Sequence, residues 1–172
     1  MHLTHVEAAG WVRVAAGAYS FVKTNNNART KYEAHTPDWH SWTPDTSLLS
    51  TGIGQFRECS FDLETHSHSD TLLSCATRAD NCIIQIATTF SDFGDPNGPF
   101  KILFVLGVCG DIVDPTGRTV VFRFQTETEM ILAWRRLIVN WDPDTVHAYN
   151  GWDFDFGYLA ERAILLGCWE EF

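Results

Sequence analysis

The chain has 172 residues, of which 45% are hydrophobic and 20% are charged, a composition typical of a folded domain rather than a disordered segment. Its 12 Lys and Arg residues stand against 22 Asp and Glu residues, so the formal net charge is −10 at pH 7. Because Lys and Arg contacts to phosphates supply most nucleic-acid affinity, this charge argues against a chain that binds nucleic acid by itself. The longest apolar run, residues 102–109, is far shorter than the ~20 residues of a membrane-spanning helix.

The first 57 residues are expected to form a small β-rich segment. Residues 11–22 alternate weakly between apolar and polar side chains, which favours a strand or a hairpin. Three successive Asn within residues 23–29 indicate a turn, and residues 37–54, rich in Pro, Ser and Thr, are typical of a connector. We therefore predict a boundary after residue 57 and a second domain over residues 58–172.

The second domain begins with a pattern of strands. Residues 59–63, 82–90 and 101–108 are expected to form three successive antiparallel strands. Asp, Pro, Asn and Gly within residues 94–99 indicate a hairpin-type connection between the last two. Residues 120–124 are predicted to form a short further strand.

A helix is predicted over residues 127–140. Apolar side chains recur there at intervals of three and four, which is the period of a helix with one buried face. Thr126 and Glu129 have the spacing of a capping box at its start. Asp142-Pro143 should end the helix, because proline cannot continue it.

The last predicted elements are a strand over residues 145–149 and a helix over residues 154–166, with Gly167 as its stop. Three antiparallel strands followed by helix, strand and helix are the order of a ribonuclease H-like fold. The sequence therefore predicts an α/β domain of this class, with a mixed sheet and helices.

Two acids, Asp62 and Glu64, are separated by one residue in the first strand of this domain. Because side chains alternate between the faces of a strand, both carboxylates should lie on one face, roughly 6.6 Å apart. A third acid, Asp155, stands where the strand at 145–149 passes through a turn containing Gly151 into the next helix. Divalent cations prefer carboxylate oxygens, and two of them about 3.5–4 Å apart can act on the attacking and leaving oxygens of phosphodiester cleavage.

The same acids also have simpler interpretations. Asp62 and Glu64 fit a solvent-facing pair on a half-buried strand, and Asp155 fits an acid that stabilises a helix N-terminus. Asp153 is the more plausible plain cap of that helix.

Two further groups of residues have side chains that can bind metals, but neither group defines a metal site. His66, His68 and Asp70 lie in a polar, Ser-rich stretch that is typical of a solvated loop, and no further ligand can be assigned. The five Cys residues lack the paired spacing of a zinc site and are expected to be free, mostly buried thiols.

Several motifs share one order and spacing with a known family. They are residues 11–14, 17–19, 60–65, 83–86, 132–134, 141–146, 148–150 and 154–159. In these motifs the chain resembles the family B DNA polymerases, and most closely their delta-type catalytic subunit. The motifs at 60–65 and 149–155 resemble the first two exonuclease motifs of the family.

The resemblance implies a proofreading 3′→5′ exonuclease that hydrolyses 3′-terminal nucleotides with two Mg²⁺ ions, for which Mn²⁺ can substitute. By this resemblance the catalytic residues and metal ligands are Asp62, Glu64 and Asp155. The residues that it assigns to binding the unpaired 3′ end are Asn150, Phe154 and Leu63.

The family has a fourth acid in a later Tyr-x-x-x-Asp motif. Residues 149–153 match that pattern only as text, because they lie inside the second motif. We therefore expect this chain to be part of a longer DNA-directed DNA polymerase, incomplete after the second exonuclease motif and inactive alone. The alternatives are a stand-alone exonuclease of the same fold and a non-catalytic ribonuclease H-like interaction domain.

The same resemblance implies the partners of the chain. They are single-stranded 3′ ends and primer-template DNA, the remainder of the polymerase chain and accessory polymerase subunits, with no membrane. The expected location is the nucleus for a cellular eukaryotic protein, and otherwise intracellular.

Overall fold

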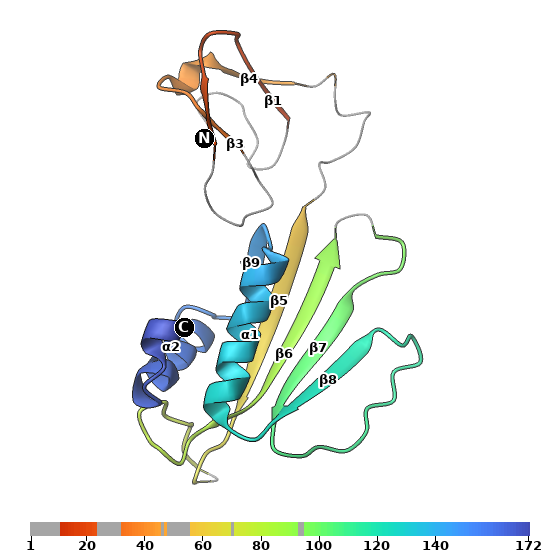
Figure 1. The fold of residues 1–172 in the computed structure, drawn as a ribbon, viewed down its shortest axis with the longest axis vertical. Helices are drawn as coiled ribbons and strands as arrows, with labels where there is room; N and C mark the ends of the chain where they lie inside the picture. Colours follow the sequence, from red (N-terminus) through yellow and green to blue (C-terminus); the bar gives the residue numbers. More distant parts are fainter. Residues whose placement is uncertain (1–10, 24–31, 46, 48–55, 70, 93–94) are drawn as a thin grey trace. The chain divides into compact units, whose positions relative to one another are not determined.

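The computed structural model describes residues 11–23, 32–45, 47, 56–69, 71–92 and 95–172. The chain divides into two compact units, residues 1–55 and residues 56–172. The larger unit is a five-stranded sheet with its helices packed against one face (Figure 1). No helix in the described part of the chain is long and apolar enough to cross a membrane.

The smaller unit contains two two-stranded antiparallel sheets. In one sheet β1 (Val12–Val14) pairs with β4 (Trp42–Pro44), which follows the short 3-10 helix η1 (Trp39–Ser41). In the other sheet β2 (Ser20–Lys23) pairs with β3 (Tyr32–His35). The first two strands therefore pair with later strands rather than with each other.

These strands account for only part of what was predicted for the smaller unit. The predicted strand or hairpin at 11–22 is two strands that are not hairpin partners. Residues 24–29 of the predicted turn, and residues 46 and 48–54 of the predicted connector, lie outside the described residues. The described part of the connector is not only loop, because it contains η1 and β4.

The sheet of the larger unit has the strand order β8-β7-β6-β5-β9. Its strands are β5 (Arg57–Thr65), β6 (Ile83–Asp92), β7 (Phe100–Leu106), β8 (Thr119–Phe124) and β9 (Thr145–His147). The three strands β5, β6 and β7 are antiparallel, as predicted, whereas β8 runs parallel to β7 and β9 parallel to β5. The prediction of a mixed sheet with helices is confirmed, and β8 and β9 make the sheet mixed.

Two strands end earlier than predicted. The strand β7, which was expected at 101–108, ends at Leu106. The strand expected at 145–149 ends at His147, because the chain turns away two residues later. Asn150 has a φ of 52°, a left-handed conformation that cannot continue a strand.

The helices begin and end close to the predicted residues. In α1 (Glu127–Trp141) the Thr126 side chain and the Glu129 side chain form the predicted capping box, and Asp142 caps the other end with a φ of 53°. Gly167, with a φ of 73°, follows α2 (Asp155–Leu165), and the short 3-10 helix η3 (Trp169–Glu171) comes next. The prediction that Asp153 caps α2 is wrong, because the N-cap is Phe154 and no side chain bonds there.

Aromatic packing fixes β5 in the core. The ring of Phe61 on β5 lies 4.9 Å from the ring of Trp134 on α1 and 5.1 Å from the ring of Phe156 on α2. The indole N–H of Trp134 donates a hydrogen bond of 3.0 Å to the Thr88 hydroxyl on β6. The strand that carries Asp62 is thus held by the residue directly before it.

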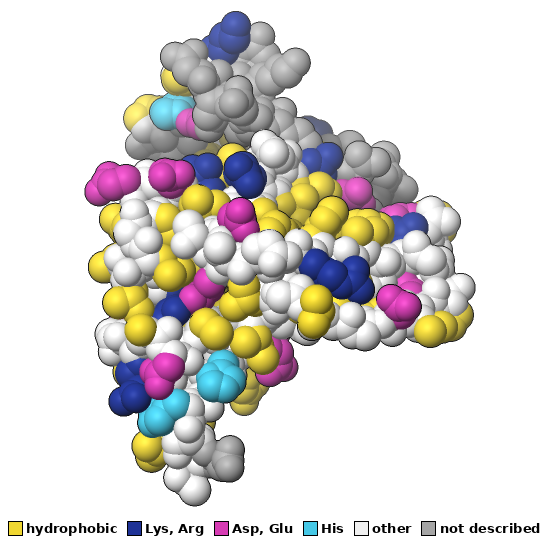
Figure 2. Space-filling view, turned by 60° about the horizontal axis from the view of Figure 1, so that its bottom comes forward, with side chains coloured by type: hydrophobic (Ala, Val, Ile, Leu, Met, Phe, Trp, Pro, Cys, Tyr) yellow, Lys and Arg dark blue, Asp and Glu magenta, His cyan; other side chains and the backbone are white. Residues whose placement is uncertain are grey.

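The thiols and the surface charges agree with the composition. None of the five Cys residues forms a disulfide, as predicted, but the prediction that they are mostly buried is wrong, because only Cys59 and Cys168 are buried. Burial raises the pKa of Cys59 to about 12. On the face drawn in Figure 2, the Lys and Arg side chains of the described residues lie in small, separate groups among hydrophobic and acidic side chains. That face offers no continuous basic surface among the described residues.

A buried ion pair joins the two helices to the loop that precedes β6. The Arg162 guanidinium on α2 donates two hydrogen bonds to the Glu127 carboxylate at the start of α1, one of them 2.8 Å long. It also donates to the backbone carbonyls of Ala76 and Arg78, at 3.0 and 2.7 Å. The same Glu127 carboxylate accepts the backbone N–H of Ile83, at 2.8 Å. One ion pair therefore satisfies buried backbone groups from the loop and from β6.

We predict that Arg162→Met lowers the free energy of unfolding by about 3–5 kcal/mol, because Glu127 would stay buried without its partner. Urea denaturation followed by the helical circular dichroism signal would measure the loss, since α1 and α2 both belong to this unit. Arg78→Met is the matched control, because its side chain pairs with Asp80 at the surface and is worth ~1 kcal/mol or less. Equal losses in the two variants would contradict the role given to the buried pair.

Candidate active site

The site begins with the alternation of side chains along β5. Cys59, Phe61 and Leu63 are buried against the helices, whereas Asp62 and Glu64 are exposed on the opposite face of the sheet. The prediction that the two acids share one face is confirmed.

Asp155 reaches this strand from the first turn of α2. Its side chain is only 1% exposed, and its Oδ1 accepts a hydrogen bond of 3.3 Å from the backbone N–H of Leu63. That N–H is available because β9 pairs with β5 only as far as Ser60, opposite His147. The third acid is therefore bonded to the backbone of the residue that separates the other two.

The environment of Asp155 disfavours its charged form. Burial raises the pKa of its carboxyl above the ordinary value of 3.8, and the nearby charge of Asp62 raises it further. The hydrogen bond from Leu63 acts in the opposite direction, because it stabilises the carboxylate. The two acids thus interact electrostatically, and a cation between them would relieve their repulsion.

A tight turn sets the position of Asp155. The carbonyl of Asn150 accepts hydrogen bonds of 3.1 Å from the backbone N–H groups of Asp153 and Phe154. A Cβ at Gly151 would lie 2.7 Å from the Cβ of Ala148 and 3.2 Å from the ring of Phe156. Glycine is therefore required at this position, because a side chain there would push the turn and α2 apart.

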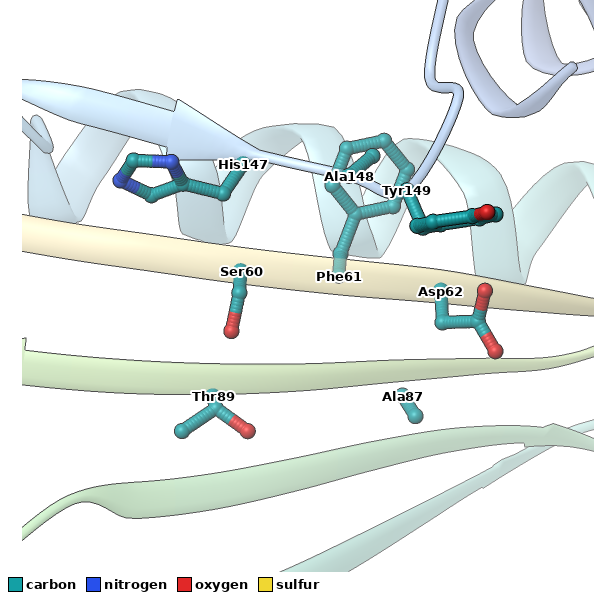
Figure 3. Close-up of a pocket in the computed structure, with 8 residues that line it drawn as sticks. All are labelled: Ser60, Phe61, Asp62, Ala87, Thr89, His147, Ala148 and Tyr149. Carbon is teal, nitrogen blue, oxygen red and sulfur yellow. The ribbon is translucent and has the colours of Figure 1, made fainter.

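A cavity of about 450 Å³ opens beside Asp62 on the exposed face of the sheet. Figure 3 shows the side chains of Ser60, Asp62 and Thr89 on the same side of the sheet, with Tyr149 and His147 at its border. Thr89 and His147 are the register partners of Ser60 on β6 and β9. Neither residue was predicted from the sequence, because only the pairing of the strands brings them near Asp62.

The predicted substrate-binding residues fall in different surroundings. Asn150 is exposed on the turn, and Phe154 is 37% exposed directly before Asp155. The side chain of Leu63 is only 5% exposed and belongs to the hydrophobic core, so its backbone alone faces the site. The predicted contact of Leu63 with the substrate would therefore have to come from its backbone and not from its side chain.

A metal ion would have to be held mainly by carboxylates. The three acids Asp62, Glu64 and Asp155 offer the oxygen ligands that Mg²⁺ and Mn²⁺ prefer, and their mutual repulsion favours a cation. Among the described residues, no group of three or more His, Cys, Asp or Glu side chains is already arranged to hold an ion. The ligand assignment remains a prediction.

The predicted loop around His66 and His68 contains the other group of metal-binding residue types. The His66 ring nitrogen Nδ1 lies 3.1 Å from the backbone carbonyl of Asp80, where it serves the packing of the loop. Asp70, the remaining member of that cluster, lies outside the described residues.

Sequence comparisons identify the relatives of this chain. It is 28% identical over 162 residues to the DNA polymerase delta catalytic subunit of Schizosaccharomyces pombe, a match that covers 92% of this chain and 14% of the relative. It is 32% identical over 179 residues to the DNA polymerase delta catalytic subunit of Arabidopsis thaliana, covering 97% of this chain and 14% of that one. A DNA polymerase of Pyramimonas orientalis virus is 40% identical over 88 residues, which are 50% of this chain and 7% of the relative.

The chain thus spans about 14% of the length of its delta-type relatives. Residues 1–168 match the family model described as the exonuclease domain of DNA polymerase family B. This match covers nearly all of the chain and confirms the resemblance seen in its motifs. The chain therefore belongs to the exonuclease domain family of the family B DNA polymerases.

Proposed function

We propose that this chain is the 3′→5′ exonuclease region of a longer family B DNA polymerase, which hydrolyses 3′-terminal nucleotides during DNA synthesis. The observation that carries the proposal is the hydrogen bond between Leu63 N–H and the Asp155 carboxylate. It holds a buried acid against the strand segment that presents Asp62 and Glu64. Residues 1–57 would be the tail of a preceding domain, and residues 58–172 the ribonuclease H-like exonuclease domain.

The chemistry of the site follows from its carboxylates. Two divalent cations bound by Asp62, Glu64 and Asp155 would stabilise the charge on the attacking and the departing oxygens of the displacement at phosphorus. Leu63 N–H orients the Asp155 carboxylate before any ligand binds, and the burial of Asp155 keeps it from turning into solvent. No side chain of the site needs to act as a nucleophile.

The proposed substrate is the unpaired 3′ end of a DNA strand on a primer-template. Asn150 and Phe154 flank the turn that leads to Asp155, and they would shape the groove for that end. With a net charge of −10, this chain would depend on other parts of a longer polymerase for most phosphate contacts. Accessory subunits and a nuclear location in a eukaryotic cell belong to the same proposal.

We predict that Mn²⁺ or Mg²⁺ raises the melting temperature of the 172-residue chain through the three acids. At ten times the dissociation constant, the stabilisation is about 1.4 kcal/mol, or a few degrees for a chain of this size. Asp155→Asn should abolish this shift while keeping an oxygen that accepts the Leu63 N–H. Without metal, the same variant should melt slightly higher than the wild type, because a buried charge near Asp62 is gone.

Asp153→Asn is the matched control, because Asp153 is an exposed acid of the same turn. It should keep the full response to metal. Calorimetric scans of the three proteins, with and without each ion, would make the comparison. Should Asp155→Asn respond to metal as strongly as the wild type, the proposed ligand set is wrong.

In the longer polymerase that we propose, Asp62→Ala with Glu64→Ala should abolish mismatch excision and leave primer extension intact. We expect excision to fall at least about 100-fold. Residues that only hydrogen-bond to a metal ligand already change metal affinity or activity about 10- to 100-fold, and loss of the ligands themselves should cost more. Glu58→Ala removes an acid from the same strand, near the edge that pairs with β9, and should excise normally. Both activities would be measured on one enzyme preparation. A parallel loss of extension and excision would show that the acids support folding instead of the excision chemistry.

A further inference from the structure

Trp152 is an exposed aromatic residue on the turn that leads to Asp155, and no step of the proposed chemistry uses it. It lies in the turn between β9 and α2, three residues before Asp155, and 86% of its side chain is exposed. Large aromatic side chains are mostly buried in folded proteins, as Trp134 is in this unit. The exposure of Trp152 therefore has no explanation in the packing of the core.

The indole of Trp152 nevertheless packs against another aromatic ring. Its ring lies 5.2 Å from the ring of Phe156, at an interplanar angle of 37°. Phe156 in turn packs on Phe61, the residue next to Asp62. Because Gly151 and the two hydrogen bonds to the Asn150 carbonyl fix the turn, little order has to be gained when a flat ligand covers the ring.

The charges around Trp152 limit what kind of ligand contact is available. Between Arg136 and Arg162 the sequence contains neither Lys nor Arg, and Asp153 and Asp155 lie on either side of Phe154. This segment cannot hold phosphates by ion pairing. Stacking of a base on an aromatic ring requires no cation, tolerates every base and contributes about 1–3 kcal/mol per base.

We propose that Trp152 is a base-stacking residue that holds single-stranded DNA next to the acidic site, an inference that rests on the proposed exonuclease function. A second ring is available on the same turn, because Tyr149 is 94% exposed and borders the cavity beside Asp62. Stacking thus supplies, at this turn, the affinity that Lys and Arg supply in most nucleic-acid sites.

The surroundings of Trp152 favour a nucleic acid over a protein partner. Surfaces that bind proteins are contiguous apolar patches. Here polar residues interrupt the apolar surface around the indole, since Asn150 and Asp153 are both exposed. The exposed rings of Trp152 and Tyr149 have exposed polar residues beside them, which suits individual bases better than a protein surface.

The test compares two 5′-labelled strands of equal length by fluorescence anisotropy, oligothymidylate and an abasic strand that has the same phosphates but no bases. The 172-residue chain is used in EDTA, so that the result does not depend on the metal site. We expect the wild type to bind the thymidylate strand roughly five- to 150-fold more tightly than the abasic strand. Trp152→Ala should lose that advantage and leave abasic binding unchanged, whereas Trp152→Phe should keep most of it.

The matched control is Trp169→Ala, which removes a half-exposed Trp from η3, beyond the C-terminal end of α2. It should bind both strands as the wild type does. The slope of log affinity against log salt concentration should stay below about 1.4, the value for two phosphate contacts at 0.7 each.

Four results of the binding measurements would overturn the proposal. Two concern the wild type, namely equal affinity for the two strands and no detectable binding of the thymidylate strand at millimolar protein. The third is an unchanged preference for the thymidylate strand in Trp152→Ala. The fourth is a salt slope above about 3.5, which corresponds to five phosphate contacts. Self-association of the wild type that Trp152→Ala abolishes would assign the ring to a protein contact and would also overturn it. Failure of the metal-dependent stabilisation that involves Asp155 would instead count against the exonuclease function, because no metal is present in the strand comparison.

Discussion

The hydrogen bond from Leu63 N–H to the Asp155 carboxylate is the contact on which the candidate site depends. It exists because β9 leaves the edge of β5 after Ser60, so that the strand has a backbone donor without a strand partner. An unpaired buried N–H would cost about 1–3 kcal/mol, and Asp155 satisfies it. The same side chain thus completes the edge of the sheet and brings an acid to the strand of Asp62 and Glu64.

This arrangement places a carboxylate where its charge is unfavourable. Burial and the charge of Asp62 both raise the pKa of Asp155, and the hydrogen bonds from the backbone N–H groups of Leu63 and of Asp155 itself oppose them. A fold selected only for stability would use a neutral acceptor at this position, since an amide also bonds to a backbone N–H. Retaining an acid is therefore a cost to stability that makes physical sense if a cation occupies the site.

The sequence predicted the elements that local chemistry determines and missed what depends on pairing between strands. The capping box of Thr126 and Glu129, the end of α1 at Asp142 and the shared face of Asp62 and Glu64 follow from spacing within one segment, and all three are confirmed. The early end of β9 at His147 and the positions of Thr89 and His147 beside Ser60 are set by partners far along the chain. Asp153 was a reasonable cap by residue type, but the turn closes on the Asn150 carbonyl instead of a side chain. The metal ligands remain a prediction. The position of each carboxylate relative to an ion depends on charged groups from other segments of the fold, and the sequence of one strand does not contain them.

The proposed function places two requirements on the turn between β9 and α2 that conflict in electrostatic terms. The acids that would hold cations also repel the phosphates of a DNA strand, and no Lys or Arg lies between Arg136 and Arg162 to offset them. Contacts that are insensitive to charge can then help to keep a strand near Asp155 without weakening its affinity for a cation. Aromatic rings meet this condition, because they attract the faces of the bases and add no charge to the site. The exposure of Trp152 beside a buried acid is therefore consistent with one site that must accept both a cation and a polyanion.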